Sequence, residues 1–261
     1  MAGYTATSID GLTVNGGRYG IRMTQQASGT LGATNSALDN QSQDGVVLSK
    51  KVNLDLGGII SNSSNAGVNV LSSSTDDWSF DSLVLEDNNI GLLHSGSGSV
   101  TCTDCDTGGN AIDVHTSGTV EWVEGEVDIT AVTATGSGLF KRARLLDLTI
   151  TADTVAVAGA GVSLLDGDSR KVANGKTDAN GVASGLKFYS HYVDASGHTV
   201  VNLAGYSMMT AAKVAYASGV ADSRYAVTGV TLVDQPGNSD TVPLVDNFDA
   251  RICYSWSSSS Y

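Results

Sequence analysis

The segment 120–130, VEWVEGEVDIT, places carboxylates at alternate positions: Glu124, Glu126 and Asp128. In a β-strand alternate residues share one face, so neighbouring members of this row would lie about 6.6 Å apart. Asp147 would stack close to the row, one coil further along the repeat described below. Carboxylates so spaced bind Ca²⁺ or act as acid and base on a glycan. The sequence favours a solvated strand face, but Glu124, Glu126 and Asp128 are its candidate metal site, with Ca²⁺ as the cofactor.

Basic residues and histidines near this row lack the partners that catalysis requires. Lys141, Arg142 and Arg144 would neutralise the carboxylates or contact an anionic sugar, and a salt-bridged surface is the simpler interpretation. His94 and His115 have no identifiable nucleophile or acid beside them, so we expect structural roles. Motifs of serine hydrolases, zinc peptidases and P-loop proteins are absent. We predict no catalytic residues, and the sequence favours a protein that is not an enzyme.

Three cysteines and a few aromatic residues complete the candidates. Cys102 and Cys105 form one CxxC, and without a second pair we expect a short disulfide or two buried thiols rather than a zinc site. Cys253 makes the count odd. Five aromatic residues would form a sugar-stacking platform only if they clustered, and core packing is the simpler prediction for them: Trp78, Trp122, Tyr189, Tyr192 and Trp256.

The composition of the 261-residue chain excludes several classes of protein. Gly, Thr and Val are abundant, Glu is rare and long helix-forming runs are missing, which predicts an all-β fold. The net charge of −13 disfavours nucleic acid as a partner. No apolar run has the length of a membrane span, and the first residues do not have the pattern of a signal peptide. The protein is then either made without a signal peptide or is an excised piece of a longer, extracellular protein with an added Met, and we favour the second interpretation.

A short motif recurs along the first part of the chain: a polar residue, turn-formers, a small residue and an apolar run. The small residue stands at Gly20, Gly45, Gly67, Gly91, Ala111 and Gly138, with Gly161 as a seventh candidate. Such spacing is typical of stacked coils that pair in parallel. Residues one position after the small residue would face the interior: Ile21, Val46, Val68, Leu92, Ile112, Leu139 and Val162. A second inward column would contain Met23, Leu48, Val70, His94, Val114, Lys141 and Leu164.

A polar column precedes the small residues by five positions: Asn15, Asn40, Asn62, Glu86 and Asp106. These residues are typical of turns. Asparagine repeated at one turn position would form hydrogen bonds along the stack, as in the ladders of cross-β assemblies.

The pattern G-[IVL]-x-[MLV] begins at Gly20, Gly45 and Gly67, and the segment at Ala111 matches it with alanine in place of glycine. It resembles the repeats of pectate-lyase-like right-handed parallel β-helices, and His94 and Lys141 depart from it. The resemblance implies a right-handed parallel β-helix over about residues 5–150, with an antiparallel β-sandwich as the rival interpretation. Such relatives carry their chemistry on outward strand faces, but no motif here matches their catalytic residues.

The sequence changes in character near residue 151. Two short motifs resemble β-sandwich modules related to the carboxypeptidase regulatory domain and transthyretin: Gly159, Ala160, Val162 and Leu164, then Thr177, Asp178 and Gly181. Further strands are expected at 198–203, 206–216, 224–233 and 249–256. We therefore predict a parallel β-helix in 1–150, an immunoglobulin-like or transthyretin-like β-sandwich in 151–250, and a tail or linker in 251–261.

This architecture predicts a non-catalytic structural or adhesive module of a microbial extracellular surface protein or filament. Its partners would be neighbouring domains of the same protein or other copies of the chain, with glycan as a further candidate. The strands at the open end of a stack have unpaired backbone N–H and C=O groups, which can pair with another chain. We therefore expect end-to-end contact between molecules near Thr5–Val14. The alternatives are a polysaccharide lyase or glycoside hydrolase that uses an outward face, and a tailspike-like virion fibre.

Overall fold

The computed structural model describes residues 7–8, 10–23, 30–49, 53–215 and 221–246. The protein is nearly all β and divides into two compact units. The first unit comprises Met1–Leu145, Phe188–Val201 and Asp234–Pro236, and the second comprises Leu146–Lys187, Asn202–Val233 and Gly237–Tyr261.

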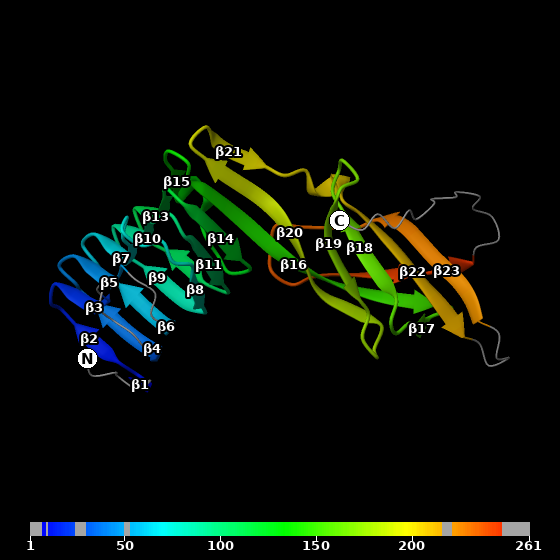
Figure 1. Cartoon of the computed structure of the whole chain (residues 1–261), viewed down its shortest axis with the longest axis horizontal. Helices are drawn as coiled ribbons and strands as arrows, with labels where there is room; N and C mark the ends of the chain where they lie inside the picture. The colour runs from blue at the N-terminus through cyan, green and yellow to red at the C-terminus, as the bar shows by residue number, and fades with distance from the viewer. Residues whose placement is uncertain (1–6, 9, 24–29, 50–52, 216–220, 247–261) are drawn as a thin grey trace. The chain divides into compact units, whose positions relative to one another are not determined.

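The first unit is a β-solenoid of about five turns, in which successive coils add parallel strands to three sheets (Figure 1). Sheet A contains β1 (Thr7–Ser8), β2 (Thr13–Asn15), β4 (Thr30–Asp39), β6 (Asn53–Ser61), β9 (Leu83–Glu86) and β12 (Asp106–Gly108). Sheet B contains β3 (Tyr19–Met23), β5 (Asp44–Leu48), β7 (Ala66–Val70), β10 (Ile90–His94), β13 (Ile112–Thr116) and β15 (Val132–Ala134). Sheet C starts with β8 (Trp78–Asp81), β11 (Ser99–Thr103), β14 (Thr119–Val123) and β16 (Leu139–Ala152). The prediction of parallel stacked coils is confirmed.

The pairing register confirms the first inward column over four coils. Ile21 pairs with Val46, Val46 with Val68, and Val68 with Leu92. All four side chains are buried. His94, two positions further along β10, is also buried, so its predicted inward orientation is correct although the residue is polar.

The fifth coil is displaced from its predicted position. Leu92 pairs with Val114, and Ile112 instead pairs with Ile90. Ile112 therefore lies two residues out of the predicted register. The prediction was wrong because a shift of two residues keeps a strand's inward and outward faces, so apolar alternation does not distinguish the two registers.

The sixth and seventh predicted copies do not continue sheet B. The sixth rung is β15, and Leu139 lies instead in β16 of sheet C. Lys141 pairs with Glu121 in that same sheet. The seventh candidate coil corresponds to β18 (Gly161–Leu165), which pairs antiparallel to both of its neighbours. A small residue before alternating apolar positions is common to many half-buried strands, so the motif overcounted the coils.

Close approach of successive coils explains the small residue at the start of each motif. A Cβ added to Gly20 would lie 2.8 Å from the carbonyl oxygen of Gly45, and one added to Gly45 would lie 2.7 Å from that of Gly67. A Cβ on Gly91 would lie 2.7 Å from the carbonyl oxygen of Asp113. Real Cβ atoms do not approach that closely, so glycine is required. The fifth anchor is therefore Asp113 and not Ala111.

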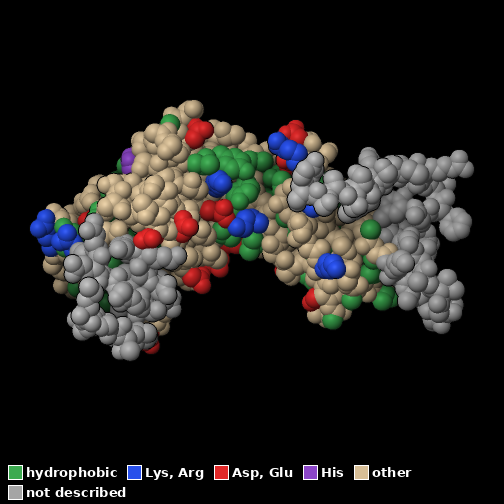
Figure 2. All heavy atoms as spheres, viewed as in Figure 1, with side chains coloured by type: hydrophobic (Ala, Val, Ile, Leu, Met, Phe, Trp, Pro, Cys, Tyr) green, Lys and Arg blue, Asp and Glu red, His purple; other side chains and the backbone are tan. Residues whose placement is uncertain are grey.

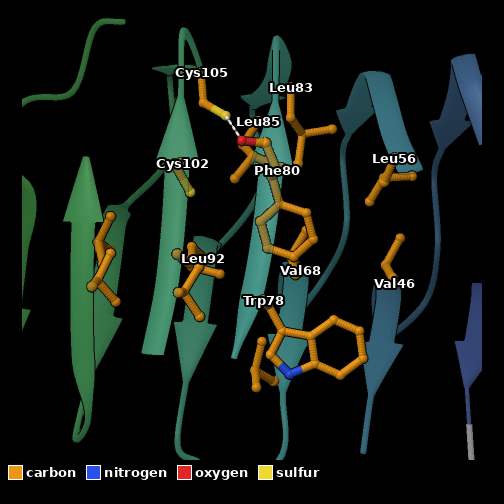
Figure 3. Close-up of a cluster of buried hydrophobic side chains, with 14 of the residues drawn as sticks. Val46, Leu56, Val68, Trp78, Phe80, Leu83, Leu85, Leu92, Cys102 and Cys105 are labelled. Atoms are coloured by element: carbon orange, nitrogen blue, oxygen red, sulfur yellow. Dashed lines mark hydrogen bonds between the residues drawn. The ribbon is translucent and has the colours of Figure 1, made fainter. Parts of the chain in front are cut away.

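Apolar side chains from all three sheets fill the interior of the solenoid (Figure 3). They include Val46, Val68 and Leu92 from sheet B, Leu56, Leu83 and Leu85 from sheet A, and Trp78, Phe80 and Cys102 from sheet C. Full burial of one such side chain stabilises the fold by about 1.5–3 kcal/mol. The column prediction thus identified one side of the core, whereas the aromatic side came from strands outside the motif.

A buried polar ladder runs along the corner between sheets A and B. The Oδ1 atom of Asn88 accepts the Ser63 N–H at 2.9 Å, and the Oδ1 atom of Asn110 accepts the Asn88 N–H at 2.9 Å. Their amide groups donate to the carbonyl oxygens of Ile60 and Leu85, at 2.9 and 2.8 Å. Asparagines do stack along the solenoid, as predicted, but the ladder lies outside the predicted column.

The predicted polar column is only partly aligned in space. Asn40 and Asn62 occupy equivalent corner positions, with φ of 59° and 54°. The next corner is Asp87, at φ 55°, one residue after the predicted Glu86. Asn tolerates this left-handed backbone better than most residues, which explains its recurrence at the corner.

The second unit contains the last part of β16 and an antiparallel sheet. Sheet D contains β18, β19 (Lys171–Lys176), β22 (Ser207–Ala215), β23 (Ala221–Gly229) and β25 (Val245–Asp246). The last part of β16 pairs with β17 (Val155–Ala156) and in parallel with β24 (Asn238–Pro243). The remaining elements are β20 (Val182–Asp194), β21 (Gly197–Val200) and the short 3₁₀ helices η1 (Ile129–Ala131) and η2 (Leu203–Gly205). The predicted boundary near residue 151 falls within β16, and the predicted strand 249–256 and tail 251–261 lie outside the described residues.

Candidate functional site

Glu124 does not lie in a strand. Strand β14 ends at Val123, and Glu124 adopts φ 54°, as Ser82 does at φ 54° and Asp104 at φ 50°. The Glu124 N–H donates to the carbonyl oxygen of Ala143, as the Asp104 N–H donates to that of Val123. Glu124 is therefore the last member of a corner column between sheets C and A. The prediction that Glu124, Glu126 and Asp128 share one strand face is wrong.

The carboxylate of Glu124 is directed towards strand β16. Its Oε1 atom accepts the backbone N–H of Leu145, and Oε2 lies 3.8 Å from Nη1 of Arg144. Burial raises the pKa of Glu124, and the Leu145 hydrogen bond and the Arg144 charge offset part of that increase. The Glu124 side chain thus satisfies a backbone donor of β16.

Two buried arginines of β16 close the end of the solenoid. Nη1 of Arg142 donates to the carbonyl oxygen of Val127 at 2.8 Å, and Nη1 of Arg144 donates to that of Gly125 at 2.8 Å. In the described residues, β12 is the last strand of sheet A, so no later strand of that sheet is present to bond these carbonyls. The guanidinium groups therefore satisfy backbone acceptors that the next coil would satisfy in the middle of the stack.

Asp234 forms an ion pair with both guanidinium groups. Its Oδ1 atom lies 3.1 Å from Nε of Arg142 and 3.1 Å from Nε of Arg144, and accepts the Ser190 hydroxyl at 2.8 Å. Burial alone would raise the pKa of Asp234, but the Ser190 hydrogen bond and the two arginines outweigh it and lower the pKa. Nδ1 of His191 lies 3.2 Å from Oδ2. We call Glu124, Arg142, Arg144 and Asp234 the cap cluster.

The other carboxylates of the predicted metal site do not converge on one point, because each has a different partner. Glu126 is exposed and pairs with Arg142 at 3.3 Å. Asp128 caps helix η1 by accepting the N–H and hydroxyl of Thr130, and these bonds lower its pKa. Asp147 accepts the Gly185 N–H. Among the described residues, no group of three or more His, Cys, Asp or Glu side chains is arranged to hold a metal ion.

The cap cluster does not have the arrangement of a nucleophilic site. His191 Nδ1 lies 3.2 Å from Ser190 Oγ and 3.2 Å from Asp234 Oδ2, so one nitrogen contacts both neighbours. A relay needs the two ring nitrogens to contact the nucleophile and the carboxylate separately. Ser190 is also buried. These contacts orient Asp234 on the arginines and leave no activated hydroxyl.

The other candidate residues have structural surroundings. His94 is buried with Nδ1 3.2 Å from the Thr116 hydroxyl, and burial lowers its pKa. His115 lies 2.8 Å from the Thr133 hydroxyl. Lys141 lies 5.9 Å from the ring centre of Tyr189. These contacts are of the kind that the sequence predicted for the histidines.

Cysteines and aromatic residues divide between the core and the surface. Cys102 and Cys105 are buried free thiols, which is one of the two predicted states. Trp78 and Trp122 belong to the core. The rings of Tyr189 and Tyr192 are 5.5 Å apart, and the Tyr189 hydroxyl donates to Glu121 at 3.1 Å. Trp256 and Cys253 lie outside the described residues.

Comparison with known proteins assigns no relatives to the chain. No protein-family model, curated protein or solved structure matches it. No helix in the described part of the chain is long and apolar enough to cross a membrane. The resemblance to pectate-lyase-like proteins therefore extends only to the β-solenoid architecture itself.

Sequence reasoning missed three members of the site: Asp234, Ser190 and His191. Asp234 is 90 residues from Arg144 in the chain. No local periodicity connects residues at that separation. A signal did exist in Arg142 and Arg144, because they occupy alternate positions on the otherwise apolar face of β16, and buried arginines require carboxylate partners.

Proposed function

We propose that the chain is a non-catalytic structural or adhesive module of a microbial extracellular surface protein or filament. The observation that carries this proposal is the cap cluster. Its guanidinium groups and carboxylates bond one another and the backbone of the last coil, so the strongest charge constellation of the described residues serves to close the solenoid. A substrate-binding site would instead need some of these charged groups to be directed towards a ligand.

The interior of the solenoid supports the same role. Strand ladders and the Asn88–Asn110 ladder connect each coil with the next one, and no cofactor or moving lid is needed to maintain them. Stacked coils of this kind make stable, extended supports. We assign the coils the right hand of the β-helices that they resemble, and we place the module outside the cell.

We further propose that the second unit is a transthyretin-like or immunoglobulin-like β-sandwich. Its two motif segments are joined by short contacts: the Ala160 N–H donates to the Thr177 hydroxyl at 2.9 Å, and that hydroxyl donates to the Val157 carbonyl. Asp178 accepts the N–H groups of Asn180 and Val182, which fixes the second turn. These bonds give physical reasons for Thr and Asp at those positions.

The test is a search for catalysis and for binding by the whole chain. The purified protein is incubated with acidic and neutral polysaccharides while new reducing ends and unsaturated uronates are measured. We expect no turnover, retention of the protein on a glycan or on a neighbouring module, and a first unit that resists limited proteolysis. Turnover that Glu126→Gln abolishes, with Glu121→Gln as the matched control, would establish the lyase or hydrolase alternative instead.

The virion-fibre alternative makes a different prediction about assembly. Trimeric fibres stay trimeric on dilution and in strong salt, whereas a surface module is a monomer or forms weak, reversible contacts. Sedimentation of the full chain separates these two outcomes. A trimer that survives both treatments would overturn the surface-module proposal.

A further inference from the structure

In the part of the chain that the structure describes, β3 is the edge strand of sheet B, and it carries positive charge. Among the described residues, β3 pairs only with β5, so its other side has no strand neighbour. Arg18 directly precedes this strand, Arg22 lies within it, and both are exposed. Neither arginine has a carboxylate partner within the described part of the chain. Two unpaired arginines are notable in a chain with 27 acidic and 14 basic residues.

Side-chain contacts hold these arginines in place. The guanidinium carbons of Arg18 and Arg22 lie 5.3 and 5.0 Å from the ring centre of Tyr19, within cation–π distance. Nε of Arg18 and the hydroxyl of Tyr19 both donate to Oε1 of Gln43, at 3.0 and 2.6 Å. The pair is therefore ordered before it binds anything, which lowers the entropy cost of an ion pair with a partner. We call Arg18, Tyr19 and Arg22 the basic edge.

The charges of the chain are segregated along the solenoid. Residues 52–140 contain thirteen Asp and Glu and neither Lys nor Arg, whereas residues 1–51 contain four basic and three acidic residues. Figure 2 shows basic side chains gathered at the end of the solenoid where β3 lies, and acidic side chains further along it. Seven of these acidic residues are exposed: Asp77, Asp81, Asp87, Asp104, Asp106, Glu126 and Asp128. The middle coils of one molecule thus complement the basic edge of another.

We propose that the basic edge is a self-association surface that binds the acid-rich coils, residues 52–140, of a second copy of this chain. The inference rests on the proposed role as a module of a surface protein or filament and names its contact. It moves the expected end-to-end contact from Thr5–Val14 to β3. Opposite charges on the two surfaces determine the orientation and accelerate encounter, and the open backbone of β3 adds a directional element.

Sedimentation of the full chain over a wide range of concentrations tests the proposal. At low salt we expect concentration-dependent association that weakens as salt screens the ion pairs. The double substitution Arg18→Glu with Arg22→Glu should raise the dissociation constant by about tenfold or more. The matched control, Lys171→Glu with Lys176→Glu, changes the net charge equally at exposed positions of the second unit and should leave association unchanged. Circular dichroism of each variant, and the milder Arg18→Gln with Arg22→Gln pair, separate loss of contact from misfolding.

A mixing experiment distinguishes this contact from a symmetric one. The Arg18→Glu, Arg22→Glu variant keeps its acid-rich coils, so a labelled sample should still bind excess wild-type protein while failing to bind itself. Failure to bind wild type would overturn the proposal, as would a monomer at every concentration and salt, or preferential binding of polyglutamate or an anionic polysaccharide. A monomer that is also non-catalytic and retained on a glycan or module would overturn this inference and leave the proposed function standing.

Discussion

The middle coils and the last coil of the solenoid satisfy their buried polar groups in different ways. In the middle coils the uncharged amides of Asn88 and Asn110 bond backbone groups of an adjacent coil. In the last coil Arg142 and Arg144 donate to backbone carbonyls instead. A repeating interior can rely on neutral groups because each coil provides partners for the next. The end of the repeat requires longer side chains, and their charge in turn requires carboxylates.

Of the substitutions that test this difference between the coils, removal of one guanidinium group from the last coil should lower the free energy of unfolding the most. Arg144→Met leaves the Glu124 and Asp234 carboxylates with less compensating charge and the Gly125 carbonyl without its donor. We expect the free energy of unfolding of the full chain to fall by about 3–5 kcal/mol, as measured by urea denaturation.

The same substitution outside the cap cluster provides the control. Lys141→Met lies three residues earlier in β16, and its ammonium group is at the partly exposed surface. It should change the unfolding free energy by less than about 1 kcal/mol. A stability equal to wild type in Arg144→Met would show that apolar packing replaces the charges, and would remove the distinction between the two kinds of coil.

Breaking the neutral ladder should have a smaller effect. Asn88→Ala leaves the Ser63 N–H and the Ile60 carbonyl without their partners inside the solenoid. Because no charge becomes unpaired, we expect a loss of about 2 kcal/mol in the same denaturation assay. Asn89→Ala, at the exposed neighbouring position, is the matched control and should stay within about 0.5 kcal/mol of wild type. Equal losses in Arg144→Met and Asn88→Ala would contradict the comparison.

The smallest expected effect concerns pH and the buried His94. Burial lowers the folded-state pKa of His94 below its usual value of 6.5, so the unfolded chain binds a proton that the folded chain does not. The stability is therefore fully present above about pH 6.5 and is lost as the pH falls below it. Between pH 7 and pH 5.5 the unfolding free energy should therefore fall, and His94 should contribute at most about 1.3 kcal/mol of that loss, the limit set by protonation of the unfolded chain.

The substitution His94→Leu isolates that contribution. Leu48 and Val70 occupy the same inward column, so leucine fits the position chemically. The variant should lose less stability than wild type on acidification, and other titrating groups cancel in the difference. Identical slopes of unfolding free energy against pH in the two proteins would show that His94 does not titrate within the core.

The solenoid was predictable because its cause is local and repeated. Gly20, Gly45 and Gly67 are each followed by the same apolar alternation, and their close approach to the next coil imposes that pattern. The predicted register was wrong at the fifth coil, because Ala111 and Asp113 are both followed by apolar residues on the inward face. Either residue could be the fifth anchor from the sequence alone, and only the pairing with neighbouring coils shows that it is Asp113.

Three members of the candidate site were predictable from the sequence: the carboxylate of Glu124 and the neutralising charges of Arg142 and Arg144. The geometry of the site was not. The alternation of carboxylates predicts a strand through residues 124–128, but Glu124 and Gly125 both adopt positive φ, at 54° and 52°, and end the strand. The polar turn residues Ser82 and Asp104 were present in the sequence, but their equivalence to Glu124 becomes visible only when the coils are stacked. Asp234 could not be predicted, because long-range ion pairs leave no periodic trace in a single sequence.

The glycine column has a consequence for how such a chain changes over generations. Each anchor glycine is constrained by the carbonyl oxygen of the coil that follows it, so a side chain introduced at Gly67 would disturb Gly91 as well as its own strand. Duplication of one complete turn, in contrast, supplies both the glycine and the carbonyl that requires it. The tube can therefore lengthen or shorten by whole turns far more readily than it can accept single substitutions at its anchors.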